Sequence, residues 1–200
     1  LMFWDNVAWI YDLFANVVNR RANQALCAEV EKLIEPADEV LECACGTGLL
    51  SGVIARKCQS LTATDFSANM LRRARKKYAR LGNVTFAQAD ILNLRYPDSR
   101  FDAVVAANVI HLLDEPTRAL RELNRVCRPG GRIIIPTYMN QTDRGTTNSV
   151  SGAIGRAGAD FKREFTFESY KQFFAAAGYV NAHYALCKGR IPCAVAVLVK

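Results

Sequence analysis

The chain has 200 residues, of which half are hydrophobic and 22% are charged, and its formal net charge is +7. This composition suits one soluble globular domain with its own core, and it excludes a disordered chain, a collagen and a coiled coil. No uncharged apolar run approaches the ~18–20 residues of a membrane-spanning helix, and Asp5 and Asp12 do not suit a secretory signal.

Strand patterns alternate with amphipathic helix patterns along the chain. The expected strands are residues 39–44, 61–64, 84–89, 101–107, 132–137, 180–186 and 192–199. The expected helices are residues 49–58, 67–81, 116–127 and 167–177, with Ser67 as an N-cap and Pro116 at a first helical position. This alternation predicts an α/β fold with a mostly parallel sheet and helices on both faces. A short turn containing Gly189 joins the last two strands as a hairpin, so the last strand is antiparallel.

Two segments stand outside this alternation. Residues 1–35 are helical and aromatic in pattern, and residues 138–165 are rich in Gly, Thr, Asn and Ser, with one short helix expected near 148–156. Long insertions in compact domains are usually functional or mobile. We therefore expect a single domain with an N-terminal helical cap (1–35), a core (36–137), a lid (138–165), and a terminal helix and hairpin (166–200).

Seven cysteines are scattered along the chain, and most lie in apolar stretches. An odd number cannot pair completely. The closest pair, Cys43 and Cys45, has no second pair or histidine cluster to complete a zinc site. We interpret the cysteines as small buried hydrophobes in a reducing compartment, which predicts a cytoplasmic protein without a bound metal.

The basic charge is concentrated in residues 67–82, which hold six cations and no acid and leave a net charge of +1 for the rest of the chain. Two interpretations are open: a solvated outer helix face, or a surface that contacts RNA or phosphate. Tyr78 is the only aromatic residue in the segment and falls on its apolar face, which favours the solvated face. The apolar residues at helical spacing are Met70, Leu71, Ala74, Tyr78 and Leu81.

Residues 40–48 form a strand pattern that runs into a glycine turn and then a helix. Gly46 and Gly48 allow the backbone to approach a ligand closely, and the helix N-terminus that follows offers unpaired N–H groups. Ligands of open parallel sheets bind at the carboxyl ends of the strands. Asp65 ends the second strand, 17 residues after Gly48, and can accept hydrogen bonds from two ribose hydroxyls. These features fit any adenosine-containing cofactor.

Two common nucleotide motifs are missing. The dinucleotide fingerprint needs Gly or Ala where Ser51 stands, and no Gly-Lys-Ser/Thr sequence provides a triphosphate loop. Further polar residues follow the third and fourth strands, namely Asp90 and residues 108–111.

Together the motifs resemble the class I S-adenosylmethionine-dependent methyltransferases, in the branch of the ubiquinone/menaquinone-biosynthesis enzymes (methyltransferase type 11). The resemblance covers residues 36–137 most closely. It implies a seven-stranded Rossmann-like sheet, S-adenosylmethionine as the cofactor, and a methyltransferase activity. The motifs that carry it are residues 42–48, 64–71, 87–91, 101–105 and 128–131.

The resemblance also implies which residues bind the cofactor. The turn after the first strand lies against its methionine and ribose portions. Asp65 holds the ribose hydroxyls with Phe66 beside the adenine, Asp90 meets the adenine amino group, Ile91 packs on the ring, and Asn108 lies near the methionine end. The expected cofactor-binding set is Glu42, Ala44, Cys45, Gly46, Thr47, Gly48, Asp65, Phe66, Met70, Asp90, Ile91 and Asn108.

Two positions in this set leave a question open. Ala44 replaces the family's first turn glycine, and its methyl group would stand close to the cofactor. Glu42 either contacts the ligand or is a buried acid bonded to backbone N–H groups.

The expected catalytic residues are His111 and Tyr11. The sulfonium is already activated, so the protein contributes mainly alignment and exclusion of water. His111, with an ordinary pKa near ~6.5, suits a general base if the acceptor must lose a proton; alternatively it is a packed histidine. Tyr11 resembles the family's N-terminal aromatic residue near the donor methyl, and core packing is equally open.

The cap and lid suggest a small, partly apolar methyl acceptor. Tyr138, Arg144 and Arg156 are candidates to contact it, and the arginines suit an anionic group. Two alternatives remain: an RNA or protein methyltransferase that uses the basic helix 67–82, and a non-catalytic cofactor-binding domain. We expect a monomer or homodimer without a nucleic-acid partner.

Overall fold

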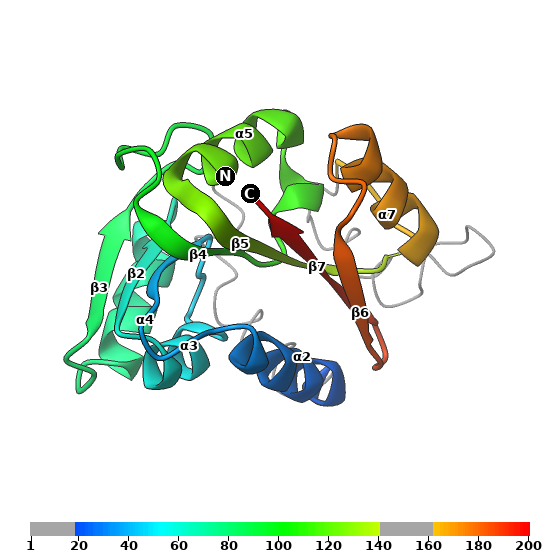
Figure 1. Ribbon diagram of the computed structural model, residues 1–200. Coiled ribbons are helices and arrows are strands. Elements are labelled where there is room, and N and C mark those ends of the chain that lie inside the picture. The colour runs from blue at the N-terminus through cyan, green and yellow to red at the C-terminus, as the bar shows by residue number, and fades with distance from the viewer. Residues whose placement is uncertain (1–18, 141–161) are drawn as a thin grey trace.

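A computed structural model describes residues 19–140 and 162–200 of the chain. Its centre is one seven-stranded sheet with the strand order β3-β2-β1-β4-β5-β7-β6 (Figure 1). All neighbouring strands are parallel except β7, which is antiparallel to both β5 and β6. The sheet predicted from the sequence is therefore confirmed, including its antiparallel last strand. The strands are β1 (Glu39–Cys43), β2 (Ser60–Asp65), β3 (Val84–Gln88), β4 (Phe101–Ala106), β5 (Cys127–Tyr138), β6 (His183–Cys187) and β7 (Cys193–Val199).

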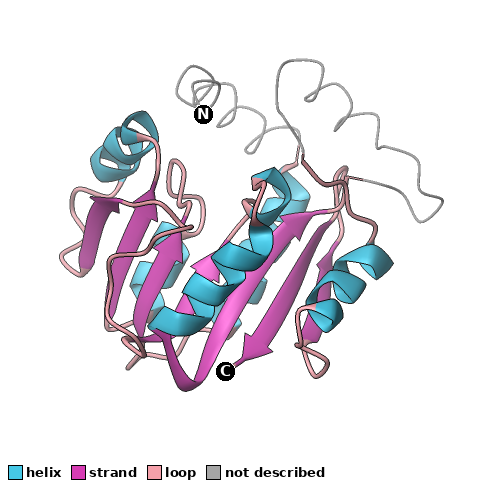
Figure 2. Ribbon diagram, turned by 90° about the horizontal axis from the view of Figure 1, so that it is seen from above, coloured by secondary structure: helices cyan, strands magenta, loops and turns pink. Residues whose placement is uncertain are grey.

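Helices cover both faces of the sheet, as Figure 2 shows from above. In Figure 1, α2, α3 and α4 lie on one side of the sheet, and α5 and α7 lie on the other. The helices are α2 (Arg20–Lys32), α3 (Ser51–Lys57), α4 (Ala68–Lys77), the short 3-10 helix η2 (Ile110–Leu112), α5 (Pro116–Val126) and α7 (Phe167–Ala176). Among the described residues, no helix is long and apolar enough to cross a membrane.

The helix starts follow local sequence signals. The Ser67 hydroxyl accepts a hydrogen bond from the Met70 N–H at 3.2 Å and caps α4, as predicted. Pro116 stands in the first turn of α5, where its missing N–H costs nothing. Thr166 and Ser169 form a reciprocal capping box at the start of α7.

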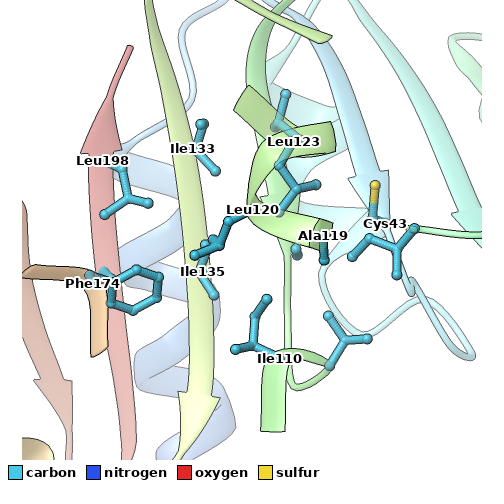
Figure 3. Close-up of a cluster of buried hydrophobic side chains, with 14 of the residues drawn as sticks. Cys43, Ile110, Ala119, Leu120, Leu123, Ile133, Ile135, Phe174 and Leu198 are labelled. Carbon is cyan, nitrogen blue, oxygen red and sulfur yellow. The ribbon is translucent and has the colours of Figure 1, made fainter. Parts of the chain in front are cut away.

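Two apolar cores lie on the two faces of the sheet. On one face, Ile133 and Ile135 of β5 belong to a buried cluster with Leu120 and Leu123 of α5 and Phe174 of α7 (Figure 3). The other cluster joins alternate residues of the same strands to α2 and α3. Because the central strands are buried on both faces, their sequences are continuous apolar runs rather than alternating patterns. Six of the seven cysteines are buried, as expected.

Two strands begin several residues away from their expected starts. The fifth strand was expected to begin at Arg132, but β5 already begins at Cys127 and includes residues 128–131. The register with β4 shifts between Phe101 and Ala103, so the four residues form an irregularity inside the strand pair. A Cβ atom at Gly131 would lie 2.8 Å from the Asp102 carbonyl oxygen, so this close approach requires glycine. The strand expected at 180–186 begins only at His183.

Helix α4 ends at Lys77, four residues earlier than the apolar spacing predicts. Tyr78 leaves the helical conformation and packs its ring against α3. Its hydroxyl donates to the Gly48 carbonyl at 2.7 Å, and a Cβ atom at Gly52 would lie 2.6 Å from its ring. The tertiary contact of Tyr78 thus sets the end of the helix.

Candidate functional site

A cavity of about 590 Å³ lies at the carboxyl ends of β1, β2, β3 and β4. This volume is within the range of about 300–1,000 Å³ that is typical of small-molecule sites. Eleven of the twelve residues expected to bind the cofactor line it, so the structure brings these distant segments together. They are Glu42, Ala44, Cys45, Gly46, Thr47, Asp65, Phe66, Met70, Asp90, Ile91 and Asn108.

The turn after β1 forms one wall of the cavity in an unusual backbone conformation. Ala44, Gly46 and Gly48 all have positive φ angles, of 53°, 56° and 84°. A left-handed conformation costs a residue with a side chain roughly 1–2 kcal/mol, and glycine adopts it freely. Ala44 therefore occupies a position whose backbone favours glycine. This backbone strain is a property of the turn, and it does not depend on whether the Ala44 methyl group contacts a ligand.

Gly48 is the one member of the expected set that does not line the cavity. A Cβ atom there would lie 2.6 Å from the Tyr78 ring. Gly48 is required for the packing of Tyr78 against the turn, and its expected contact with the cofactor stays a prediction.

Glu42 is 2% exposed at the cavity wall, and the Ser51 hydroxyl donates to its Oε2 atom at 2.6 Å. Burial raises the pKa of Glu42, the Ser51 hydrogen bond partly lowers it and the charge of Asp65 adds to the rise, and together they bring the pKa to about 8. The carboxyl is therefore mostly protonated at neutral pH. Glu42 is a buried acid whose partner is a hydroxyl group rather than a backbone N–H, and its contact with the ligand stays a prediction.

Asp65 joins the turn after β1 to the start of α4. Its Oδ2 atom accepts from the Gly46 N–H and its Oδ1 atom accepts from the Ser67 N–H, both at 2.8 Å. A carboxylate accepts hydrogen bonds at about four sites, which is the chemistry expected of a group that holds ribose hydroxyls. Phe66 follows with 49% of its surface exposed, as an aromatic face suited to an adenine ring.

The end of β3 brings a third acid to the cavity. The Ala89 N–H donates to the Asp65 carbonyl at 3.1 Å, which holds the two strand ends together. Asp90 is exposed, and its Oδ1 atom accepts from the Leu92 N–H at 2.9 Å. Ile91 is 8% exposed and contributes an apolar surface next to this carboxylate.

Asn108 connects the cavity to β5 and α2. Its φ is 53°, and its Oδ1 atom accepts from the Tyr138 N–H at 3.0 Å. The Tyr138 hydroxyl donates to Asn23 of α2 at 2.8 Å. Tyr138 is therefore used in a structural contact and does not line the cavity, where it was expected to meet the methyl acceptor.

His111 does not line the cavity either. It lies in η2 with 3% of its surface exposed, and burial lowers its pKa to about 4. A neutral imidazole that binds a proton so weakly is a poor general base, so the reasoning from an ordinary pKa does not hold. Tyr11, Arg144, Arg156 and most of the expected lid lie outside the described residues.

The cavity also includes residues that the sequence did not single out, among them Leu112, Leu113, Asp114, Glu115 and Lys162. The Lys162 ammonium lies 3.3 Å from Asp114 Oδ1. Asp114 and Glu115 lie between η2 and α5, in the connection that follows the fourth strand. This connection leaves the edge of the sheet that carries the glycine turn, which was the available signal.

These residues fit an adenosine-containing cofactor of mixed polarity. Acids follow or end three successive strands, an exposed ring lies beside one of them, and the remaining wall is largely apolar. Among the described residues, no group of three or more His, Cys, Asp or Glu side chains could hold a metal ion.

Comparison with known proteins places the chain among methyltransferases. Residues 41–135 match the model of a methyltransferase domain family. The phosphatidylethanolamine N-methyltransferase of Cereibacter sphaeroides is 33% identical over 150 residues, which cover 74% of this chain and 71% of that protein. The demethylmenaquinone methyltransferase of Clavibacter sepedonicus is 33% identical over 66% of this chain, and this chain spans only 55% of that protein.

Solved structures show the same fold. An S-adenosylmethionine-dependent methyltransferase of Thermotoga maritima, described as a possible histamine N-methyltransferase, matches with a TM-score of 0.73 over 98% of both chains at 19% identity. An S-adenosyl-L-methionine-dependent methyltransferase of Methanococcus maripaludis, described as putative, matches with a TM-score of 0.71 over 98% of this chain and 93% of that one, at 20% identity.

Proposed function

Since the chain belongs to the family of S-adenosylmethionine-dependent methyltransferases, we propose that it transfers a methyl group by in-line displacement to a small, partly apolar acceptor. One observation carries this proposal: the cavity at the carboxyl ends of the strands combines ribose- and adenine-binding groups with a largely apolar wall. S-adenosylmethionine supplies a sulfonium-activated methyl group when it is bound.

Different residues of the cavity bind different parts of this cofactor. The Asp65 carboxylate accepts hydrogen bonds from the ribose hydroxyls, and the Asp90 carboxylate accepts one from the adenine amino group. Phe66 and Ile91 pack against the adenine ring. The turn around Gly46 and the side chain of Asn108 face the methionine portion. This assignment follows the family's motifs and agrees with the residues that line the cavity.

The protein's contribution to the transfer is alignment and exclusion of water. Met70, Leu50 and Leu113 give the cavity apolar surface. The proposal assigns no proton transfer to His111, because its imidazole is buried and neutral.

The named acceptors of two relatives support a lipid-like acceptor. Phosphatidylethanolamine and demethylmenaquinone, which appear in the names of those relatives, are both lipids with a polar head and apolar chains. Lys162, Asp114 and Glu115 provide polar groups at the same cavity, suited to a polar head.

Methyl transfer from radiolabelled S-adenosylmethionine tests the proposal. The protein is incubated with phosphatidylethanolamine or demethylmenaquinone in detergent micelles, and separately with tRNA and with a mixed protein substrate. We expect label in a lipid acceptor. Label found only in tRNA or protein would support the alternative acceptors, and cofactor binding without any transfer would support a non-catalytic domain.

A further inference from the structure

The excess positive charge of the molecule lies on one outer surface. Between Cys43 and Ala89 the chain has eight cations and a single acid, Asp65, which accounts for the whole net charge of +7. Two of these cations, Arg56 and Lys57, end α3. The other six form what we call the basic face of α4: Arg72, Arg73, Arg75, Lys76, Lys77 and Arg80.

The six side chains of the basic face are exposed. Within residues 19–140 and 162–200, Arg72, Lys76 and Arg80 form no ion pair with a carboxylate. Arg75 donates to the Phe86 carbonyl at 2.9 Å, and the Lys77 ammonium lies 5.1 Å from the centre of the Tyr78 ring. Neither contact neutralises a charge, so these five side chains give the basic face a positive potential.

Helix stability does not account for this arrangement. Arg72 and Lys76, like Arg73 and Lys77, are four residues apart, and like charges at this spacing destabilise a helix. The helix dipole favours cations in the last turn, which suits Arg75, Lys76 and Lys77. It does not favour Arg72 and Arg73, which lie near the middle of α4. An anionic partner would offset this repulsion.

The basic face continues across α3 and begins at the rim of the cavity. Arg56 and Lys77 both lower the pKa of Cys27, so charges from α3 and α4 reach the same part of α2. At the other end of α4, Ser67 and Met70 line the cavity, and the half-exposed ring of Phe66 stands beside them. A partner bound to α4 therefore lies next to the cavity.

We propose that the basic face of α4 binds the surface of a lipid bilayer that contains anionic phospholipids. The inference rests on the proposed function, in which the acceptor is lipid-like. Clustered Lys and Arg side chains are attracted to anionic lipid headgroups.

A nucleic acid is the other anionic partner to consider, and the basic face suits it less. Single-stranded nucleic acids bind to grooves in which aromatic rings stack on bases. Tyr78 is the aromatic residue of this segment, and its ring packs against Gly48 and Gly52. The basic face of α4 therefore offers positive charge but no aromatic side chain on which a base could stack.

Vesicle sedimentation with the full chain, without cofactor or acceptor, tests the proposal. One vesicle type is phosphatidylcholine, and the other contains about one third phosphatidylglycerol, enough to give the surface a negative potential. We expect binding only to the anionic vesicles at low salt, and its loss at about 1 M salt, where the Debye length is ~3 Å. The double variant Arg72→Gln, Lys76→Gln should bind about 30-fold more weakly, as expected for two cations at the surface.

The matched control is the double variant Arg95→Gln, Arg121→Gln, which has the same net charge. Arg121 lies on α5, on the opposite face of the sheet, and Arg95 follows Leu94, whose carbonyl is bonded to Arg125 of α5. Both control residues are exposed. The control should bind within about twofold of the wild type, because α5 lies on the opposite side of the sheet from α4.

Three results would overturn the proposal: equal binding to neutral vesicles, an equal loss in the control variant, or binding of tRNA but not of vesicles through Arg72 and Lys76. A separate titration with S-adenosylhomocysteine reports on the proposed function. Anionic vesicle binding without cofactor binding would contradict the proposed function and leave the docking surface in place.

Discussion

At the scale of single residues, the cavity shows how burial changes the chemistry of a side chain. Glu42 and His111 are both nearly inaccessible, and burial moves their pKa values in opposite directions because it disfavours the charged form of each. Glu42 is held by Ser51 at the wall of the cavity, whereas His111 lies behind it. A sequence shows the type of each residue and not its burial, which is why the lowered pKa of His111 could not be predicted from it.

The pKa of Glu42 makes stability depend on pH. Between its ordinary pKa of 4.5 and about 8, the folded protein holds a proton that the unfolded chain has released. The stability that this proton contributes is complete below about pH 4.5 and is lost as the pH rises toward 8. For one group, the slope is at most about 1.4 kcal/mol per pH unit.

The variant Glu42→Gln removes this titration while keeping the size of the side chain. We expect its free energy of unfolding to increase relative to the wild type as the pH rises from 5 to 8, measured by urea denaturation. Glu168→Gln, at an exposed position on α7, is the matched control and should follow the wild type at both pH values. Parallel curves for the wild type and Glu42→Gln would contradict the raised pKa.

At the scale of elements, the start of α4 couples a helix cap to the cavity. Ser67 caps the helix through the Met70 N–H, both residues line the cavity, and the Ser67 N–H donates to Asp65. Thr166 provides an equivalent cap for α7 and does not line the cavity. The two caps therefore separate the effect of a lost cap from an effect on the site.

Ser67→Ala and Thr166→Ala should each lower the free energy of unfolding by about 1 kcal/mol, the usual loss for an N-cap hydroxyl. Only Ser67→Ala should also weaken the binding of S-adenosylhomocysteine, because it loosens the wall that carries Asp65. Urea denaturation and calorimetric titration of both variants measure this. Equal cofactor affinities in the two variants would show that the cap does not position the site.

The same elements show which boundaries a sequence can predict. Ser67 and Pro116 act within their own helix turns, so the starts of α4 and α5 follow from local chemistry. The end of α4 depends on where Tyr78 packs, and the irregularity in β5 depends on the approach of Asp102 to Gly131. Such contacts are made between distant segments, and local patterns do not contain them.

At the scale of the whole molecule, the sheet explains why most of the cavity was predictable. Glu42, Asp65, Asp90 and Asn108 are far apart in the chain, but each ends or follows a parallel strand, and these carboxyl ends share one edge. Lys162 reaches the cavity from a segment without a motif, so its contribution depends on tertiary packing. The surplus charge is likewise visible in the sequence, whereas its position beside the cavity is not.

The central claim is that the cavity at this edge holds S-adenosylmethionine through Asp65. Calorimetric titration with S-adenosylhomocysteine tests it on the wild type, on Asp65→Ala, and on Glu168→Ala as a control at an exposed acid of α7. We expect binding by the wild type and the control. Loss of the Asp65 hydrogen bonds should weaken it by about 1–3 kcal/mol, or about 5- to 150-fold. No binding by the wild type, or an unchanged affinity in Asp65→Ala, would contradict the account.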